Sequence, residues 1–299
     1  MKYIKHPQTP EQHCTILKQR GLIIDDAARA VKYIGVVGYF RLTGYMFHLQ
    51  SDDGRHTFIE GSKFEDIIRL YQFDKRLRLI ISEYLERIEI YLRAKLTDKY
   101  SVQHGFYWFN DINHFEDREI FDAIKREIQI AYDQPRELFL KRFKTKYTSE
   151  ILPPSNMALE VLSLGKLARL YKALKNVDGK ANIAAEFHLP PNVVTSWFIY
   201  LANVRNICAH HSRLWNKRVT ADRPIFPSRD KYKFKGENFT DSNTTLYGII
   251  SIVDRLLFSF NPHNSFAKKV ELLIGEFSVD CSLMGFPDNW KETANWRMR

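Results

Sequence analysis

The segment from residue 62 to residue 92 constrains the fold more than any other part of the sequence. Its apolar side chains recur at intervals of three and four over roughly 30 residues. Charged side chains such as Lys75 and Glu83 occupy the opposite face. The residues from Ser62 to Glu65 have the form of a capping box. The sequence therefore predicts one long amphipathic helix that begins near Ser62 and forms the spine of the fold.

Helical signals also dominate the rest of the chain. A capping box at Thr9 is followed by a proline in the first helical position, and Asp25 or Asp26 can cap a second short helix. Further segments with helical spacing are 116–133, 155–176, 191–210, 243–260 and 265–276. We therefore expect an all-α fold, mainly a helical bundle, with a small helical module at residues 1–61 and a larger helical domain at residues 62–299.

Two segments depart from the helical pattern. The turn Asp52-Asp53-Gly54 can join residues 47–49 and 56–58 in a minor hairpin. Residues 218–240 contain two prolines and several lysines but no periodicity, so we expect a long basic loop there.

Cysteine usage and charge narrow the class of protein. Cys14, Cys208 and Cys281 are far apart and odd in number, so we expect no disulfide framework, no metal site and no cofactor. Residues 1–7 lack the apolar core of a signal peptide, and the most apolar stretch, 246–260, is too short to span a bilayer. These features predict a soluble cytoplasmic protein without a membrane partner. The net charge of +10 suits a polyanion such as RNA, although it could also serve solubility alone.

Residues 203–216 contain the side chains best suited to catalysis. Asn206 follows Arg205 directly, and His210 and His211 come shortly after. Arginine offers phosphate a planar fork of donors, and histidine transfers protons near neutral pH. Asn206 can hydrogen-bond a phosphate oxygen or hold the histidine. These residue types suit metal-independent cleavage of RNA, a reaction in which the 2′-hydroxyl attacks phosphorus and leaves a 2′,3′-cyclic phosphate and a 5′-hydroxyl.

A regular helix would keep the arginine and the first histidine apart. Residues five positions apart differ by about 140° around the axis, so Arg205 and His210 would not share one face. We therefore expect the helix to end or distort near Cys208, or the two side chains to reach a groove from opposite flanks. A two-fold homodimer would bring two arginines and two histidines around one phosphate.

The spacing alone is weak support for catalysis, because the chain has 10 histidines. Arg41 and His48 fit a similar spacing, with six residues between them. There Leu42 follows the arginine and aromatic residues crowd the interval, so we interpret this stretch as a packed turn.

Longer stretches resemble known families. The arginine–histidine spacing resembles the R-x4-6-H motif of the HEPN superfamily, whose active members are metal-independent ribonucleases. Residues 38–45, GYFRLTGY, resemble a signature of the Abi-like (abortive infection) family. Residues 70–78 and 86–94 are similar to that family's long helix, and residues 205–216 resemble its RNA-cleavage motif. The resemblance implies an all-α HEPN core, antiphage defence and RNA cleavage at a composite dimeric site. Some members are associated with a structured noncoding RNA, which makes such an RNA a candidate partner.

Two arginines outside the motif allow two interpretations each. The aromatic residues around Arg41 could stack on bases while Arg41 holds a phosphate, but we favour a compact turn packed into the core. Arg93 lies four residues after Glu89 and can pair with it. That pair could line the RNA cleft, although an ordinary surface pair is the simpler interpretation.

Two basic segments could guide RNA to the site. Arg142 and Lys144 alternate with aromatic residues, and Arg213, Lys217 and Arg218 directly follow the histidines. Basic residues interleaved with aromatic ones suit single-stranded RNA. A solvated helix face explains the first group nearly as well.

These observations predict a homodimeric endoribonuclease that acts as a toxin in antiphage defence. Such a toxin needs restraint in its own cell, and an antitoxin, a guide-like RNA and a phage-borne activator are the candidates for its control. Arg205 would stabilise phosphate charge, His210 would act as general acid or base, and Asn206 would orient one of them. His211 is the alternative catalytic histidine. The competing hypothesis is a non-catalytic RNA-binding protein that forms a ribonucleoprotein with a structured noncoding RNA. A basic protein with a purely structural role comes third.

Overall fold

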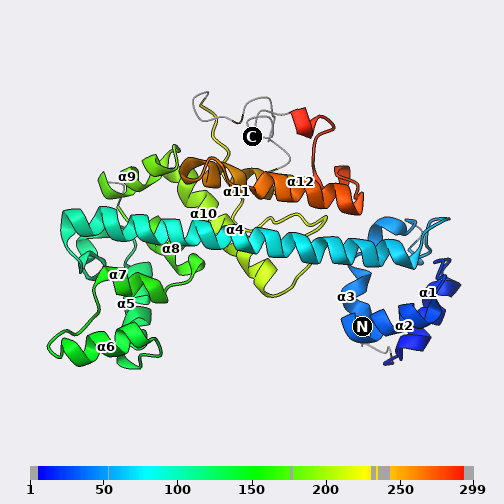
Figure 1. Cartoon of the computed structure of the whole chain (residues 1–299), viewed down its shortest axis with the longest axis horizontal. Coiled ribbons are helices and arrows are strands. Elements are labelled where there is room, and N and C mark those ends of the chain that lie inside the picture. The colour runs from blue at the N-terminus through cyan, green and yellow to red at the C-terminus, as the bar shows by residue number, and fades with distance from the viewer. Residues whose placement is uncertain (1–5, 53, 176–177, 230–233, 235–242, 293–299) are drawn as a thin grey trace. The chain divides into compact units, whose positions relative to one another are not determined.

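The computed structural model describes residues 6–52, 54–175, 178–229, 234 and 243–292 (Figure 1). Across these residues the protein has twelve α-helices and no β-strand, which confirms the predicted all-α fold. None of the described helices is both long and apolar enough to cross a membrane.

Contacts divide the chain into two compact units. Unit 1 comprises Met1–Arg78 and Glu271–Val279, and unit 2 comprises Leu79–Val270 and Asp280–Arg299. The long helix contributes its first part to unit 1 and the remainder to unit 2. A domain boundary between residues 61 and 62 stays a prediction.

Helix α4, Phe64–His104, is the predicted spine (Figure 1, cyan). Its 41 residues span about 60 Å, so it extends well past the expected end near residue 92. The apolar spacing continues through Leu96 and Tyr100, which are both fully buried. Gly105 then stops the helix with a φ of +77°, a left-handed conformation that glycine adopts without strain.

The start of α4 differs from the expectation. The helix begins at Phe64, and the amide of Lys63 donates to the side chain of Asp66 at 3.3 Å. The hydroxyl of Ser62 donates instead to the carbonyl of Leu49 at 3.4 Å. The capping box predicted at Ser62 is therefore wrong, because Asp66 performs the capping one position later.

Unit 1 begins with the helices α1, Pro10–Gln19, and α2, Ala27–Val37. The capping box of Thr9 is confirmed, since Thr9 and Gln12 bond each other's backbone amides at 3.3 and 2.9 Å. Asp26 caps α2 by accepting from the amide of Arg29 at 2.9 Å. Local capping chemistry therefore fixes both helix starts.

The expected hairpin is reduced to one antiparallel bridge between Gln50 and Phe58. Residues Phe47–Leu49 form a 3₁₀ turn. The amides of Leu49 and Gln50 bond the carbonyls three residues back, at Met46 and Phe47, and not a partner strand. Asp53, in the predicted turn, lies outside the described residues. Residues 218–229 form neither helix nor strand, as expected, and most of the remaining predicted loop also lies outside the description.

The GYFRLTGY segment follows α2 directly and contains the short helix α3, Tyr39–Thr43. Gly38 has a φ of +92°, which favours glycine, and Leu42 and Tyr45 are buried. Phe40, however, is 91% exposed. The interpretation of the whole stretch as a packed turn is therefore wrong at Phe40, because α3 directs that side chain to solvent.

Unit 2 contains most of the helices. They are α5, Arg118–Asp133; α6, Leu138–Lys146; α7, Ser155–Ala158; α8, Leu164–Ala173; α9, Asp178–Glu186; α10, Pro191–Ala209; and α11, Leu246–Phe260. Helix α12, Phe266–Phe277, begins in unit 2. Helix α8 packs against α5 and α10, and α10 also contacts α9 and α11. Helix α10 therefore has neighbours on several sides.

The single helix predicted over residues 155–176 is wrong, because the chain breaks into α7, a 3₁₀ turn and α8. Leu162 and Ser163 at the break have extended backbones. Arg93 donates to the carbonyls of Leu159 and Leu162, each at 3.0 Å. This side chain therefore satisfies carbonyls that a continuous helix would have bonded internally.

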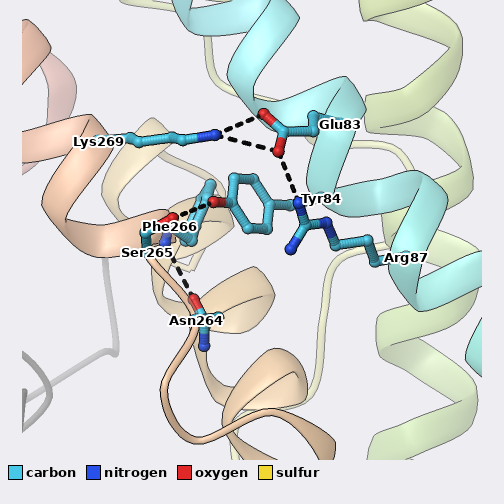
Figure 2. Close-up of polar contacts among 7 residues, drawn as sticks. All are labelled: Glu83, Tyr84, Arg87, Asn264, Ser265, Phe266 and Lys269. Carbon is cyan, nitrogen blue, oxygen red and sulfur yellow. Dashed lines mark hydrogen bonds and ion pairs between the residues drawn. The ribbon is translucent and has the colours of Figure 1, made fainter.

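A polar group connects α4 to the start of α12 within unit 2 (Figure 2). Glu83 accepts from Arg87 at 2.8 Å and from Lys269 at 2.8 and 3.1 Å. Tyr84 shares a hydrogen bond of 2.8 Å with the hydroxyl of Ser265. The Arg87 guanidinium and the Lys269 ammonium lie 4.6 and 5.2 Å from the Tyr84 ring centre, distances typical of cation–π contacts.

Candidate functional site

The last turn of α10 holds the arginine–histidine motif. The helix ends at Ala209, close to the end expected near Cys208 under one of the two alternatives, and His210 is its C-cap. His211 has a left-handed φ of +55°, and its amide bonds the carbonyl of Cys208 at 3.0 Å. The amide of Ser212 bonds the carbonyl of Ile207 at 3.0 Å. These two bonds form a Schellman motif, in which a histidine occupies the position that usually carries glycine.

The motif side chains differ in exposure. Arg205 is half-buried and donates to the side-chain oxygen of Asn206 at 3.3 Å. Asn206, His210 and His211 are exposed. Because the helix is regular up to Ala209, Arg205 and His210 diverge by about 140° around its axis. The imidazole of His210 makes no hydrogen bond or ion pair with any residue that the structure describes.

The residues after the histidines anchor this end of the motif. Leu214 and Trp215 are buried in the core of unit 2, and Asn216 has a φ of +47°, a conformation that asparagine tolerates. Packing and backbone conformation therefore account for the Leu-Trp-Asn string. Of the basic residues predicted to bind RNA here, Arg213 and Lys217 are half-buried and Arg218 is exposed.

A cleft of about 450 Å³ lies along α8 and α10, and Asn206 lines it. Asn203 lies one turn earlier on α10 and donates to Asp222 at 3.0 Å, which places Asp222 at the cleft wall. The helices approach closely here, since a Cβ added to Gly165 would lie 3.8 Å from that of Ala202. Small residues at this crossing therefore allow the polar side of α8 to lie close to α10.

Three basic residues of α8 form the other wall of this cleft: Lys166, Arg169 and Lys172. Their spacing of three keeps them on one side of the helix, opposite its buried apolar residues. Lys166 pairs with Glu127 at 2.6 Å. Arg169 and Lys172 are exposed, and neither side chain bonds or pairs with another described residue. The cleft therefore offers two uncommitted cations to an anionic ligand.

A second cavity of about 440 Å³ continues from the cleft, with Lys172 and Asp222 lining both. It adds Arg223 and the buried Lys180. Burial lowers the pKa of Lys180, and its ammonium donates to the carbonyls of Lys172 and Leu174 at 2.8 and 2.9 Å. Lys180 therefore supports the end of α8 and pairs with Glu116 at 3.6 Å, while Arg223 adds a cation to a cavity that Glu116 and Asp222 also line.

The other arginines and lysines predicted to bind RNA do not gather at this cleft. Arg41 is exposed in unit 1, and Arg142 is exposed on α6. Lys144 caps α5 by donating to the carbonyls of Tyr132 and Asp133, each at 3.1 Å. Arg93 is only 14% exposed, and its predicted pair with Glu89 is confirmed at 3.0 Å. None of these four residues lines the cleft.

The sequence interpretation missed the three basic residues of α8. Their spacing on an amphipathic helix indicates one basic face. A single helix over residues 155–176 gives no reason to place that face beside the motif. Only the docking of α8 on α10 shows that they face Asn206. Within the described residues, no group of three or more His, Cys, Asp or Glu side chains is placed to hold a metal ion.

A sequence model of the Abi-like protein family matches residues 32–216, more than half of the 299 residues. The chain belongs to the Abi-like protein family. The matched segment of this Abi-like protein contains the GYFRLTGY stretch, all of α4 and the motif on α10, and it ends at Asn216. The family indicates a role in abortive infection. Comparison of this Abi-like protein with curated proteins and with solved structures gives no match.

Proposed function

We propose that this Abi-like protein is a HEPN-type, metal-independent endoribonuclease that acts as a toxin in antiphage defence. The observation that carries the proposal is the position of Asn206. It lines a cleft with two uncommitted cations, and it is hydrogen-bonded to Arg205. Asn206 therefore links the cleft to Arg205, while Arg205 and the exposed histidines are not among the residues that line it. Phosphates of single-stranded RNA would bind Arg169 and Lys172 and lead the strand toward the motif.

The chemistry follows from these side chains. Arg205 and Asn206 bind the non-bridging oxygens of the scissile phosphate and stabilise the charge that develops there. The 2′-oxygen forms a bond to phosphorus while its proton passes to a base, and the bond from phosphorus to the 5′-oxygen breaks as that oxygen gains a proton. His210 supplies one of these transfers, with His211 as the alternative.

A homodimer would supply the second transfer. One imidazole cannot act as base and acid on opposite sides of phosphorus at the same moment, and Arg205 and His210 of one chain diverge. A second copy related by a two-fold axis would add another histidine and another arginine. We therefore propose a composite site in which the two copies face one phosphate.

Cleavage of end-labelled single-stranded RNA in EDTA tests this function. We expect the native protein to leave 2′,3′-cyclic phosphates, and Arg205→Gln or His210→Gln to slow cleavage by at least about 100-fold. His263→Gln removes an exposed histidine outside the site and should cut at the native rate. Cleavage retained in a purified His210→Gln, His211→Gln double variant would exclude the proposed mechanism.

Mixing variants tests the composite site. Native and His210→Gln chains, denatured together in varied ratios and refolded, form mixed dimers with one intact histidine. A shared site that needs both imidazoles predicts that cleavage falls with the square of the native fraction. A fall in direct proportion to the native fraction argues for independent sites.

One observation favours the competing hypothesis of a non-catalytic RNA-binding protein. A catalytic histidine is usually oriented by a hydrogen bond, and His210 makes none with the described residues. Tight, salt-sensitive binding of a structured noncoding RNA, with no cleavage by the native protein, would support this alternative.

A further inference from the structure

A separate cavity of about 520 Å³ lies at the opposite end of α10 from the motif. Pro190 and Pro191, at the start of the helix, line it. The 19 residues of α10 place this end about 28 Å from the histidines. The cavity is therefore distinct from the cleft that Asn206 lines.

Arg255 is the most informative residue of this cavity. It lies on α11, among apolar residues, and is half-buried. Burial lowers the pKa of Arg255, and the neighbouring Asp254 carboxylate only partly opposes this effect. Its guanidinium forms no hydrogen bond or ion pair with any described residue. A half-buried cation without a hydrogen-bonded partner costs free energy, part of which an anionic ligand would recover.

Two further basic side chains line the same cavity. Arg229 comes from the segment after α10, and His188 comes from the end of α9. Both are exposed, and neither side chain bonds another described residue. None of the residues that line the cavity carries a carboxylate. Three groups that can bear positive charge therefore line this cavity, and the described lining residues add no carboxylate to balance them.

The end of α10 adds to this positive potential. The positive end of the helix dipole lies at Pro190 and Pro191. Proline has no amide hydrogen to donate, so donors for a ligand must come from the side chains. The planar fork of Arg255 matches two oxygens of one phosphate.

We propose that this cavity binds a phosphate group carried by a nucleotide or by RNA. Arg255 binds two of its oxygens from the buried side, and Arg229 and His188 close over it from the rim. The proposal does not depend on RNA cleavage, because it rests on a cavity remote from the motif.

Thermal unfolding of the full chain tests the proposal. Inorganic phosphate, 5′-AMP and a short single-stranded RNA are added in turn to the native protein, to Arg255→Gln and to Arg69→Gln. The last variant removes one exposed arginine of unit 1 and controls for charge. The RNA series uses an Arg169→Gln, Lys172→Gln background, so that the α8–α10 cleft contributes less. A ligand that binds only the folded state raises Tm in proportion to its affinity.

We expect at least one ligand to raise the Tm of the native protein and of Arg69→Gln, and to bind Arg255→Gln at least tenfold more weakly. A shift with phosphate and 5′-AMP identifies a small nucleotide as the source, and a shift with RNA alone identifies a strand. Equal shifts in native protein and Arg255→Gln, or no shift with any ligand, would overturn the proposal. If Arg255→Gln fails to fold, the exposed Arg229→Gln variant repeats the comparison.

Discussion

The hydroxyl of Tyr45 donates a buried hydrogen bond of 2.6 Å to the carboxylate of Asp74, 29 residues further along the chain. Arg78 pairs with the same carboxylate from one helical turn later. Tyr45 belongs to the GYFRLTGY stretch and the other two residues to α4, so the contact joins two of the segments that carry the family resemblance. Burial, and then the charge of Asp74, raises the pKa of Tyr45.

Removing members of this group should have unequal effects on stability. Tyr45→Phe loses one hydrogen bond while Arg78 still pairs with Asp74, and we expect a loss of about 1–3 kcal/mol. Asp74→Ala leaves the buried Arg78 charge unpaired, and we expect a loss of about 3–5 kcal/mol. Urea unfolding measures both. Tyr107→Phe removes an exposed hydrogen bond and serves as control. Equal losses for Tyr45→Phe and Asp74→Ala would contradict this account.

At His211 we expect glycine to give a more stable protein than alanine, the opposite of the order within a helix. Its left-handed backbone favours glycine over alanine by about 1 kcal/mol. Both substitutions remove the imidazole, so its contacts cancel in the comparison. We therefore expect His211→Gly to be more stable than His211→Ala in urea unfolding. At Ala209, within the helix, substitution by glycine should instead cost about 1 kcal/mol. The same sign at both positions would exclude the Schellman assignment.

We expect Arg93 to contribute to the stability of the fold and not to RNA binding. Its guanidinium binds two carbonyls at the break before α8 and pairs with Glu89 and Glu160 at 3.0 and 3.3 Å. Arg93→Met leaves the Leu162 carbonyl without this donor and the Leu159 carbonyl with only the Leu162 amide, and we expect a loss of about 2–4 kcal/mol. RNA affinity of the folded variant should keep its native dependence on salt. A stable Arg93→Met protein with weakened RNA binding would support the original prediction that Arg93 contacts RNA.

Local signals in the sequence were enough for most helix positions. The apolar spacing of α10 and the caps at Thr9 and Asp26 depend on neighbouring residues, and the structure places them as expected. Helix α4 forms as its apolar spacing predicts, but it begins and ends later than expected. The break between α7 and α8 depends on Arg93, about 70 residues earlier. Contacts of this kind leave no periodic trace in the sequence.

Only part of the candidate site could be predicted from the sequence, because the rest depends on the packing of helices that are far apart in the chain. The motif is contiguous, so Arg205, Asn206 and the histidines stand out by spacing. Arg169 and Lys172 become relevant only when α8 docks on α10. Arg255 does not stand out in the apolar stretch 246–260, because its lack of a partner among the described residues is a property of three-dimensional packing.

The pair Glu83–Lys269 should stabilise the protein only within a window of pH (Figure 2). Hydrogen bonds from Lys269 lower the pKa of Glu83 below its ordinary 4.5, and Glu83 raises the pKa of Lys269 above its ordinary 10.5. The contribution of Glu83 is therefore present above pH 4.5 and lost as pH falls through its lowered pKa. That of Lys269 is present below pH 10.5 and lost as pH rises through its raised pKa.

The two side chains are about 40% exposed, so their pair is screened by solvent. We expect Glu83→Gln to cost less than about 1 kcal/mol at pH 7, and this cost to shrink as pH falls below 4.5 and the Glu83 carboxylate takes up its proton. Urea unfolding across a series of pH values from 7 downward measures the change. Glu86→Gln, an exposed neighbour on α4, should have little effect throughout the series. A cost for Glu83→Gln that is the same above and below the measured titration of Glu83 would show that packing, and not charge, is responsible.

The basic wall of the α8–α10 cleft should determine how RNA binding responds to salt. Each phosphate contact with single-stranded RNA contributes a slope of about −0.7 to the plot of log affinity against log salt concentration. Arg169→Gln combined with Lys172→Gln should therefore make the slope shallower by about 1.4 and weaken binding at low salt. Arg69→Gln with Lys268→Gln removes the same charge from exposed positions outside the cleft and should leave the slope unchanged. Equal changes in the two double variants would mean that net charge attracts RNA, and that the cleft beside Asn206 does not hold it.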